Sequence, residues 1–139
     1  MLWTIDFTIP ANTPRENPVE ASLTVEGDVI TWVSILIPSG HFALAGMKIL
    51  YGNKPLIPEE VDMWIKGNNE TLQWEDYIPL PERETTLRFM GYNLDTDNDH
   101  TFYVRIVTRY RWQLAPYEML GKAVDGIIRL LRRMGFRVE

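Results

Sequence analysis

Residues 100–112, HTFYVRIVTRYRW, form the longest unbroken strand pattern in the chain. One side of the pattern carries Arg105, Arg109 and Arg111. The other side carries large or β-branched side chains, at Phe102, Val104, Ile106, Thr108 and Tyr110. Because successive side chains of a β-strand point to opposite faces, the stretch predicts one long strand with a buried face and a basic face.

Length and composition indicate one globular domain. The chain has 139 residues, of which 45% are hydrophobic, 12% aromatic and 24% charged. A chain of this size buries one hydrophobic core but not two. It contains no cysteine, which excludes disulfides, thiolate metal sites and a cysteine nucleophile.

The pattern of the first residues indicates a strand and not a targeting segment. Residues 1–10 alternate apolar and polar side chains, and they lack the basic start and the continuous apolar run of a signal peptide. No stretch has the apolar length of a membrane span. We therefore expect no signal peptide, no membrane span and folding in the cytoplasm.

Six further strands are predicted before the long one, with glycine and proline between them. Gly27 and Asp28 form a tight turn that predicts a hairpin. Residues 52–70 are irregular apart from one helical turn predicted in 59–64. The predicted strands are residues 2–9, 19–26, 29–37, 43–51, 71–77 and 85–92. The fold class is therefore all-β, an antiparallel β-sandwich or jelly roll of about seven to eight strands, occupying residues 1–112.

Residues 113–139 predict one amphipathic helix, with Pro116 in its first turn and Gly135 at its end. The net charge changes sign near this point. Residues 1–108 carry 7 Lys/Arg and 16 Asp/Glu, a balance of −9, whereas residues 109–139 carry 7 Lys/Arg and 3 Asp/Glu, a balance of +4. We expect the helix to pack on its own sandwich or on a neighbouring subunit. The residues predicted to bind a partner are Leu120, Val124, Ile127, Arg129, Leu131, Arg132 and Arg133.

Candidate metal and catalytic residues are few. Asp95, Asp97 and Asp99 alternate as calcium ligands can, but an EF-hand loop also needs glycine and glutamate where this chain has His100 and Ile106. A solvated loop is the favoured interpretation, and a calcium site outside the EF-hand class is the alternative. His41 and His100 are both predicted at strand starts, where either one can pair with an aspartate of this loop. No spacing indicates a catalytic set, a cofactor or a nucleotide-binding loop, so we expect a protein that is not an enzyme.

Tryptophans offer the one candidate site for a small ligand. Trp64 and Trp74 flank the polar run KGNNE and are predicted as the more exposed pair. Trp3 and Trp32 lie on apolar strands and are predicted in the core.

Two stretches carry a resemblance to a class of proteins. Residues 9–58, IPANTPRENPVEASLTVEGDVITWVSILIPSGHFALAGMKILYGNKPLIP, and residues 91–107, GYNLDTDNDHTFYVRIV, resemble small β-sandwich proteins from the virion-structure modules of phages and related viruses. The likeness lies in strand pattern and turn sequences and covers residues 5–108. It implies a capsid-decoration, minor capsid or fibre-associated protein that binds other virion proteins and uses no cofactor.

Three functions follow as hypotheses. The first is a non-enzymatic structural protein of a larger assembly, such as a virion, that forms homo-oligomers through the helix and the proline-rich arm of residues 10–18. The second is a carbohydrate-binding module using Trp64 and Trp74, with or without calcium. The third is an adaptor for nucleic acid or a membrane surface through the helix arginines, and the acidic remainder of the chain disfavours it.

Overall fold

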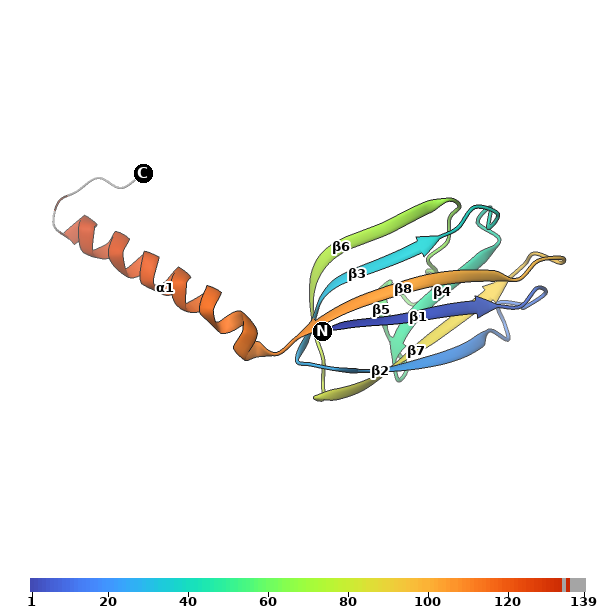
Figure 1. The fold of residues 1–139 in the computed structure, drawn as a ribbon, viewed down its shortest axis with the longest axis horizontal. Coiled ribbons are helices and arrows are strands. Elements are labelled where there is room, and N and C mark those ends of the chain that lie inside the picture. Colours follow the sequence, from blue (N-terminus) through green and yellow to red (C-terminus); the bar gives the residue numbers. More distant parts are fainter. Residues whose placement is uncertain (134, 136–139) are drawn as a thin grey trace.

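The computed structural model describes residues 1–133 and residue 135, and it describes side chains outside 115–125. It contains eight strands followed by one helix (Figure 1). The elements are β1 (Leu2–Ile9), β2 (Val19–Glu26), β3 (Val29–Ile37), β4 (Ala45–Tyr51), β5 (Lys54–Ile57), β6 (Glu70–Pro79), β7 (Glu84–Asn93), β8 (His100–Arg109) and α1 (Arg111–Arg133).

The strands form two four-stranded sheets, with strand orders β1-β8-β3-β6 and β2-β7-β4-β5, and every pairing is antiparallel. Four of the pairings are nested along the chain: β4 with β5, β3 with β6, β2 with β7 and β1 with β8. The chain therefore resembles one long hairpin folded over into two layers. The predicted all-β sandwich is confirmed.

The core lies between the two sheets and follows the alternation of the sequence. On β8, Phe102, Val104 and Ile106 are at most 1% exposed, and Thr108 is fully buried. The opposite face of β8 carries the exposed side chains of Arg105 and Arg109. The buried and basic faces predicted for this strand are therefore confirmed over the length of β8.

The region predicted as irregular contains one additional strand. Residues 54–57 form β5, which pairs with β4 at the edge of its sheet. A proline at position 55 is compatible with an edge strand, where one side of the backbone has no partner. The helical turn predicted for residues 59–64 is wrong, because these residues form bends and turns.

Trp32 lies beside a β-bulge in β3. The register of β3 against both neighbours shifts between Ile30 and Trp32. Relative to β8, Thr31 is an extra residue in β3, so Ile30 and Val33 both face the core, at 1% and 0% exposure. Trp32 is partly exposed and faces outward, so its predicted place in the core is wrong. Trp3 packs against the core, as predicted.

The boundary between strand and helix lies before the predicted one. β8 ends at Arg109 and α1 begins at Arg111, so Arg111 and Trp112 are helical and Pro116 lies in the second turn. The Asp28 carboxylate accepts a hydrogen bond from the Arg111 backbone N–H at 2.8 Å. The Gln113 side chain accepts another from the Tyr110 N–H at 2.8 Å, which is the return bond of a capping box. These two bonds fix the start of the helix.

Helix α1 leaves the end of the sandwich at which β8 finishes and extends away from both sheets (Figure 1). Tyr110 fixes the start of α1, because its phenol donates a hydrogen bond to the Glu26 carboxylate at 3.2 Å and its ring stacks on Trp112. Within the described residues, no helix combines the length and the hydropathy that crossing a bilayer requires.

Candidate functional site

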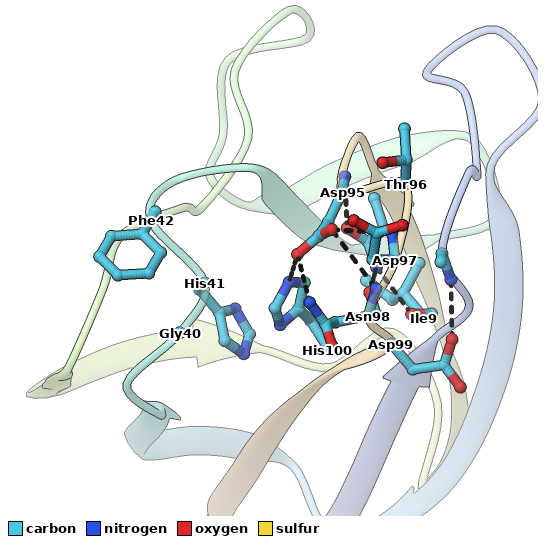
Figure 2. Close-up of polar contacts among 12 residues, drawn as sticks. Ile9, Gly40, His41, Phe42, Asp95, Thr96, Asp97, Asn98, Asp99 and His100 are labelled. Atoms are coloured by element: carbon cyan, nitrogen blue, oxygen red, sulfur yellow. Dashed lines mark hydrogen bonds and ion pairs between the residues drawn. The ribbon is translucent and has the colours of Figure 1, made fainter.

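His41 and His100 lie side by side (Figure 2). They lie at the start of β8, and this strand runs from there toward α1 (Figure 1). Their ring centroids are 4.5 Å apart. His100 starts β8, and its Nε2 is 2.9 Å from the Asp95 carboxylate. The sequence left open which histidine pairs with an aspartate of the loop, and the structure pairs His100 with Asp95.

His41 is the more deeply buried of the two, at 1% exposure. Its Nε2 is 3.1 Å from the Thr101 carbonyl oxygen, whereas its buried Nδ1 has no partner among the described residues. Burial, and then the nearby His100, lower the pKa of His41, and the bond to the Thr101 carbonyl raises it in part. The ring also meets Phe102 edge-on. The burial of both rings favours a structural role for the pair.

The Asp95 carboxylate organises the loop between β7 and β8. It accepts backbone bonds from Asp97 at 3.0 Å and Asn98 at 3.3 Å, in addition to the contact with His100. These bonds, led by the one from Asp97, lower the pKa of Asp95 to about 2. The Asp99 carboxylate accepts the Ala11 N–H at 2.8 Å. Within the described residues, these aspartates do not belong to a group arranged to hold a metal ion.

The exposed side chain of Phe42, in the turn beside the histidines, was not predicted. Phe42 is 70% exposed, and it points away from the histidine pair (Figure 2). Phe42 and Ala43 both have positive φ, at 46° and 59°, a conformation that side chains other than glycine seldom adopt. The Asn68 side-chain oxygen accepts the backbone N–H groups of Gly40 and Phe42 and holds this turn. Asn68 lies in the polar run KGNNE, which the sequence linked only to the tryptophans.

The two tryptophans predicted as ligand-binding residues do not form one surface. Trp64 meets the Tyr92 ring edge-on at 4.9 Å and has the Lys48 Nζ 4.1 Å from its ring centroid. Trp74 lies on β6 in the other sheet, packs against the core and donates a hydrogen bond to Asp76. Both side chains are only partly exposed.

A hollow lies instead on the outer face of the sheet β1-β8-β3-β6. Its volume is about 250 Å³. The lining residues come from three adjacent strands and are Trp32, Ser34, Leu36, Thr71, Gln73, Tyr103 and Arg105. Trp32 forms one wall, on the same face of β3 as Ser34 and Leu36. Because the sequence of β3 is largely apolar on both faces, its periodicity did not show which face is outward, and the hollow was not predicted.

A larger groove lies between β5 and β6, the edge strands of the two sheets. Its volume is about 560 Å³, and it includes the acidic side chains Glu59 and Asp76 and one base, Lys54. Its remaining lining residues are Pro55, Leu56, Val61, Tyr77, Ile78 and Pro79. Val61 is 70% exposed and Tyr77 is 58% exposed. The groove is therefore an exposed surface that combines apolar side chains with two acidic residues and one basic residue.

The predicted partner-binding residues all lie on α1. Ile127 and Leu130 are 57% and 56% exposed, and Leu131 is partly exposed. Arg129, Arg132 and Arg133 are exposed. Leu120 and Val124 lie outside the residues whose side chains are described. The described part of the helix thus presents apolar and basic side chains to its surroundings together.

Comparisons with known proteins give no family. No protein-family model matches the sequence, and no curated protein sequence matches it. The chain is similar in strand arrangement to PliG of Aeromonas hydrophila, a periplasmic inhibitor of g-type lysozyme, at 11% identity and a TM-score of 0.37, over 76% of this chain and 82% of that one.

Two further solved structures show a similar arrangement. VP2 of the infectious bursal disease virus subviral particle matches at 10% identity and a TM-score of 0.40, over 78% of this chain and 33% of that one. The Yersinia pseudotuberculosis-derived mitogen matches at 14% identity and a TM-score of 0.35, over 78% of this chain and 86% of that one. At these TM-scores the likenesses carry no argument about function.

Proposed function

We propose that the protein is a non-enzymatic structural protein whose jelly-roll sandwich assembles with further copies through α1. The nested antiparallel pairings support the jelly-roll assignment, since a long hairpin rolled into two sheets produces these strand orders. The larger assembly that we propose is a virus particle, in accord with the sequence resemblance over residues 5–108. In that case the protein is located in the virion.

The exposed apolar side chains of α1 carry the proposal. A helix of 23 residues is about 35 Å long, and in proteins most helical stability comes from packing of an apolar face. Ile127 and Leu130 are more than half exposed, because α1 extends away from its own sandwich (Figure 1). A neighbouring molecule therefore has to supply the packing surface.

The charge distribution indicates which neighbour. Arg129, Arg132 and Arg133 are exposed on the helix, whereas the sandwich residues 1–108 have a balance of −9. Opposite charges steer association and fix its orientation. A second copy of the chain supplies an acidic sandwich, and its groove between β5 and β6 supplies apolar side chains with Glu59 and Asp76 beside them. An amphipathic helix in an apolar groove is a common mode of recognition.

Light scattering coupled to gel filtration tests this proposal in the full-length chain. We expect the wild type to form oligomers in a concentration-dependent manner, and the double variant Ile127→Glu/Leu130→Glu to be a monomer of 16.2 kDa. Burying two carboxylates in an apolar groove is costly, so the oligomer should weaken by at least about tenfold.

The matched control is Leu2→Glu, which replaces another exposed leucine, 61% exposed on β1. It should assemble like the wild type. A wild type that remains monomeric at high concentration would refute self-assembly through α1. The virion location is tested separately, by searching purified particles from the natural source for peptides of this chain, whose absence would remove that part of the proposal.

A further inference from the structure

The hollow on the outer face of the sheet β1-β8-β3-β6 has a polar floor and larger side chains around it. Ser34 lies at its centre on β3 and is 7% exposed. Arg105 on β8 and Gln73 on β6 lie directly opposite Ser34 in the two neighbouring strands. Because serine is short, the sheet is lowest at Ser34, between the longer side chains of Gln73 and Arg105.

The rows of side chains on either side of Ser34 form the walls of the hollow. Leu36 is opposite Tyr103 on one side and Thr71 on the other, and its side chain is 41% exposed. Trp32 forms the wall at the other end, two positions before Ser34 on the same face of β3. The walls thus present apolar surfaces, two of them aromatic, and they stand on paired strands of a hydrogen-bonded sheet, which holds them in place.

The polar groups of the hollow are not used by the fold. Within the described residues, no hydrogen bond or ion pair engages the side chains of Ser34, Gln73 or Arg105. A hydroxyl and an amide can each donate and accept a hydrogen bond, and a guanidinium binds a carboxylate through two parallel bonds. The volume, about 250 Å³, is below the range of about 300–1,000 Å³ that holds drug-sized ligands.

We propose that this hollow binds one sugar ring that carries a carboxylate, such as a hexuronic acid or sialic acid unit of a glycan. The apolar face of the ring would pack on Trp32 or Tyr103, the ring hydroxyls would bond to Ser34 and Gln73, and the carboxylate would pair with Arg105. The site uses no residue of α1 and is independent of the proposed assembly. It also lies apart from Trp64 and Trp74.

Saturation-transfer NMR with the full-length chain tests the site, because it observes the sugar and works with protein oligomers. D-glucuronate and N-acetylneuraminate are the acidic probes, D-glucose and D-galactose are the neutral probes, and acetate reports binding of a carboxylate alone. We expect the acidic sugars to bind about tenfold more tightly than the neutral ones, the contribution expected of a charge-assisted hydrogen bond. Acetate should give no signal at the same concentration.

Variants locate the binding. Arg105→Gln should remove the preference for the acidic sugars while weak binding of the neutral ones remains. Trp32→Ala and Ser34→Leu should each abolish binding, the first by removing a wall and the second by filling the hollow. Circular dichroism checks that each variant is folded, and the use of two variants keeps the test valid if one of them unfolds.

Trp74→Phe is the control that alters a tryptophan outside the hollow, and it should bind like the wild type. The absence of signal from every sugar would overturn the proposal, as would an acidic preference that persists in Arg105→Gln. Loss of binding in Trp74→Phe but not in Trp32→Ala would place the site elsewhere and overturn it equally. Each of these results leaves the assembly of the chain through α1 unaffected.

Discussion

His41 shows how the surroundings of one residue make the stability of the fold depend on pH. Its ring is 1% exposed, and it faces His100, which in turn bonds to Asp95. Burial lowers the pKa of His41 below the ordinary value of 6.5. The unfolded chain therefore binds a proton at this position more readily than the folded chain. By linkage, the stability of the fold is unaffected by His41 above pH 6.5 and declines as the pH falls below it.

We predict that urea denaturation at a series of pH values will show this decline as the pH falls below 6.5. Asp95 contributes in a separate window, because its pKa of about 2 lies below the ordinary 3.8, and its stabilisation is lost only as the pH falls from 3.8 toward 2. The variant His41→Gln, which keeps a donor for the Thr101 carbonyl, should flatten the part of the curve just below pH 6.5. Asp97→Asn should retain the slope of the wild type, and an unchanged slope in His41→Gln would contradict the assignment to His41.

Single residues also show where the periodicity of the sequence no longer predicts which side chains are buried or in contact. The buried face of β8 follows from alternation alone, because each residue's side is set by its immediate neighbours along the chain. In β3 the alternation is interrupted relative to β8 by one extra residue, Thr31, so Ile30 faces the core although Trp32, two positions later, faces outward. His100 and Asp95 are close in the sequence, so their contact is local. Which histidine pairs with an aspartate also depended on the turn that buries His41. Asn68, which is distant in the sequence, holds that turn. The outer hollow could not be predicted either, because its lining residues come from three strands that are distant from one another in the sequence.

At the scale of elements, the start of α1 depends on a contact between distant parts of the chain. Arg111 donates its backbone N–H to the carboxylate of Asp28, 83 positions earlier. A carboxylate at a helix N-terminus satisfies an unpaired N–H group and interacts favourably with the helix dipole. The sequence pattern placed the helix in residues 113–139 with Pro116 in its first turn, because it contains no sign that the β2–β3 turn would lie beside residue 111.

We predict that Asp28→Ala will destabilise the first turns of α1 by about 1 kcal/mol. Since α1 extends away from the sandwich, the loss should appear as fraying of the helix and not as unfolding of the sheets. Circular dichroism at 222 nm should show less helix at 25 °C, while the midpoint of sandwich unfolding changes little. Asp28→Asn keeps an acceptor oxygen and should give an intermediate signal. Equal helix content in Asp28→Ala and the wild type would show that this bond does not stabilise α1.

At the scale of the whole molecule, two different surfaces are proposed to meet, α1 of one copy and the β5–β6 groove of the next. Such an interface is heterologous, so it generates a ring if the rotation between copies closes and a filament if it does not. Part of its free energy comes from exposed arginines and acidic residues, whose attraction is screened by salt. We therefore predict that raising the salt concentration weakens the oligomer without dissolving the apolar contact.

Charge reversal tests the two surfaces separately. The variant Glu59→Lys/Glu60→Lys reverses the charge of one residue that lines the groove and of its exposed neighbour, and Arg129→Glu/Arg132→Glu makes the helix acidic. Sedimentation measurements should show that each variant assembles more weakly than the wild type. A mixture of the two should regain assembly, because the charge-reversed groove of the first accepts the acidic helix of the second, and the native groove and helix also remain available in the mixture. The control Asp6→Lys/Glu16→Lys, at exposed positions away from the groove, should assemble normally. If that control weakens assembly as strongly, or if the mixture regains nothing, the contact is not between α1 and this groove.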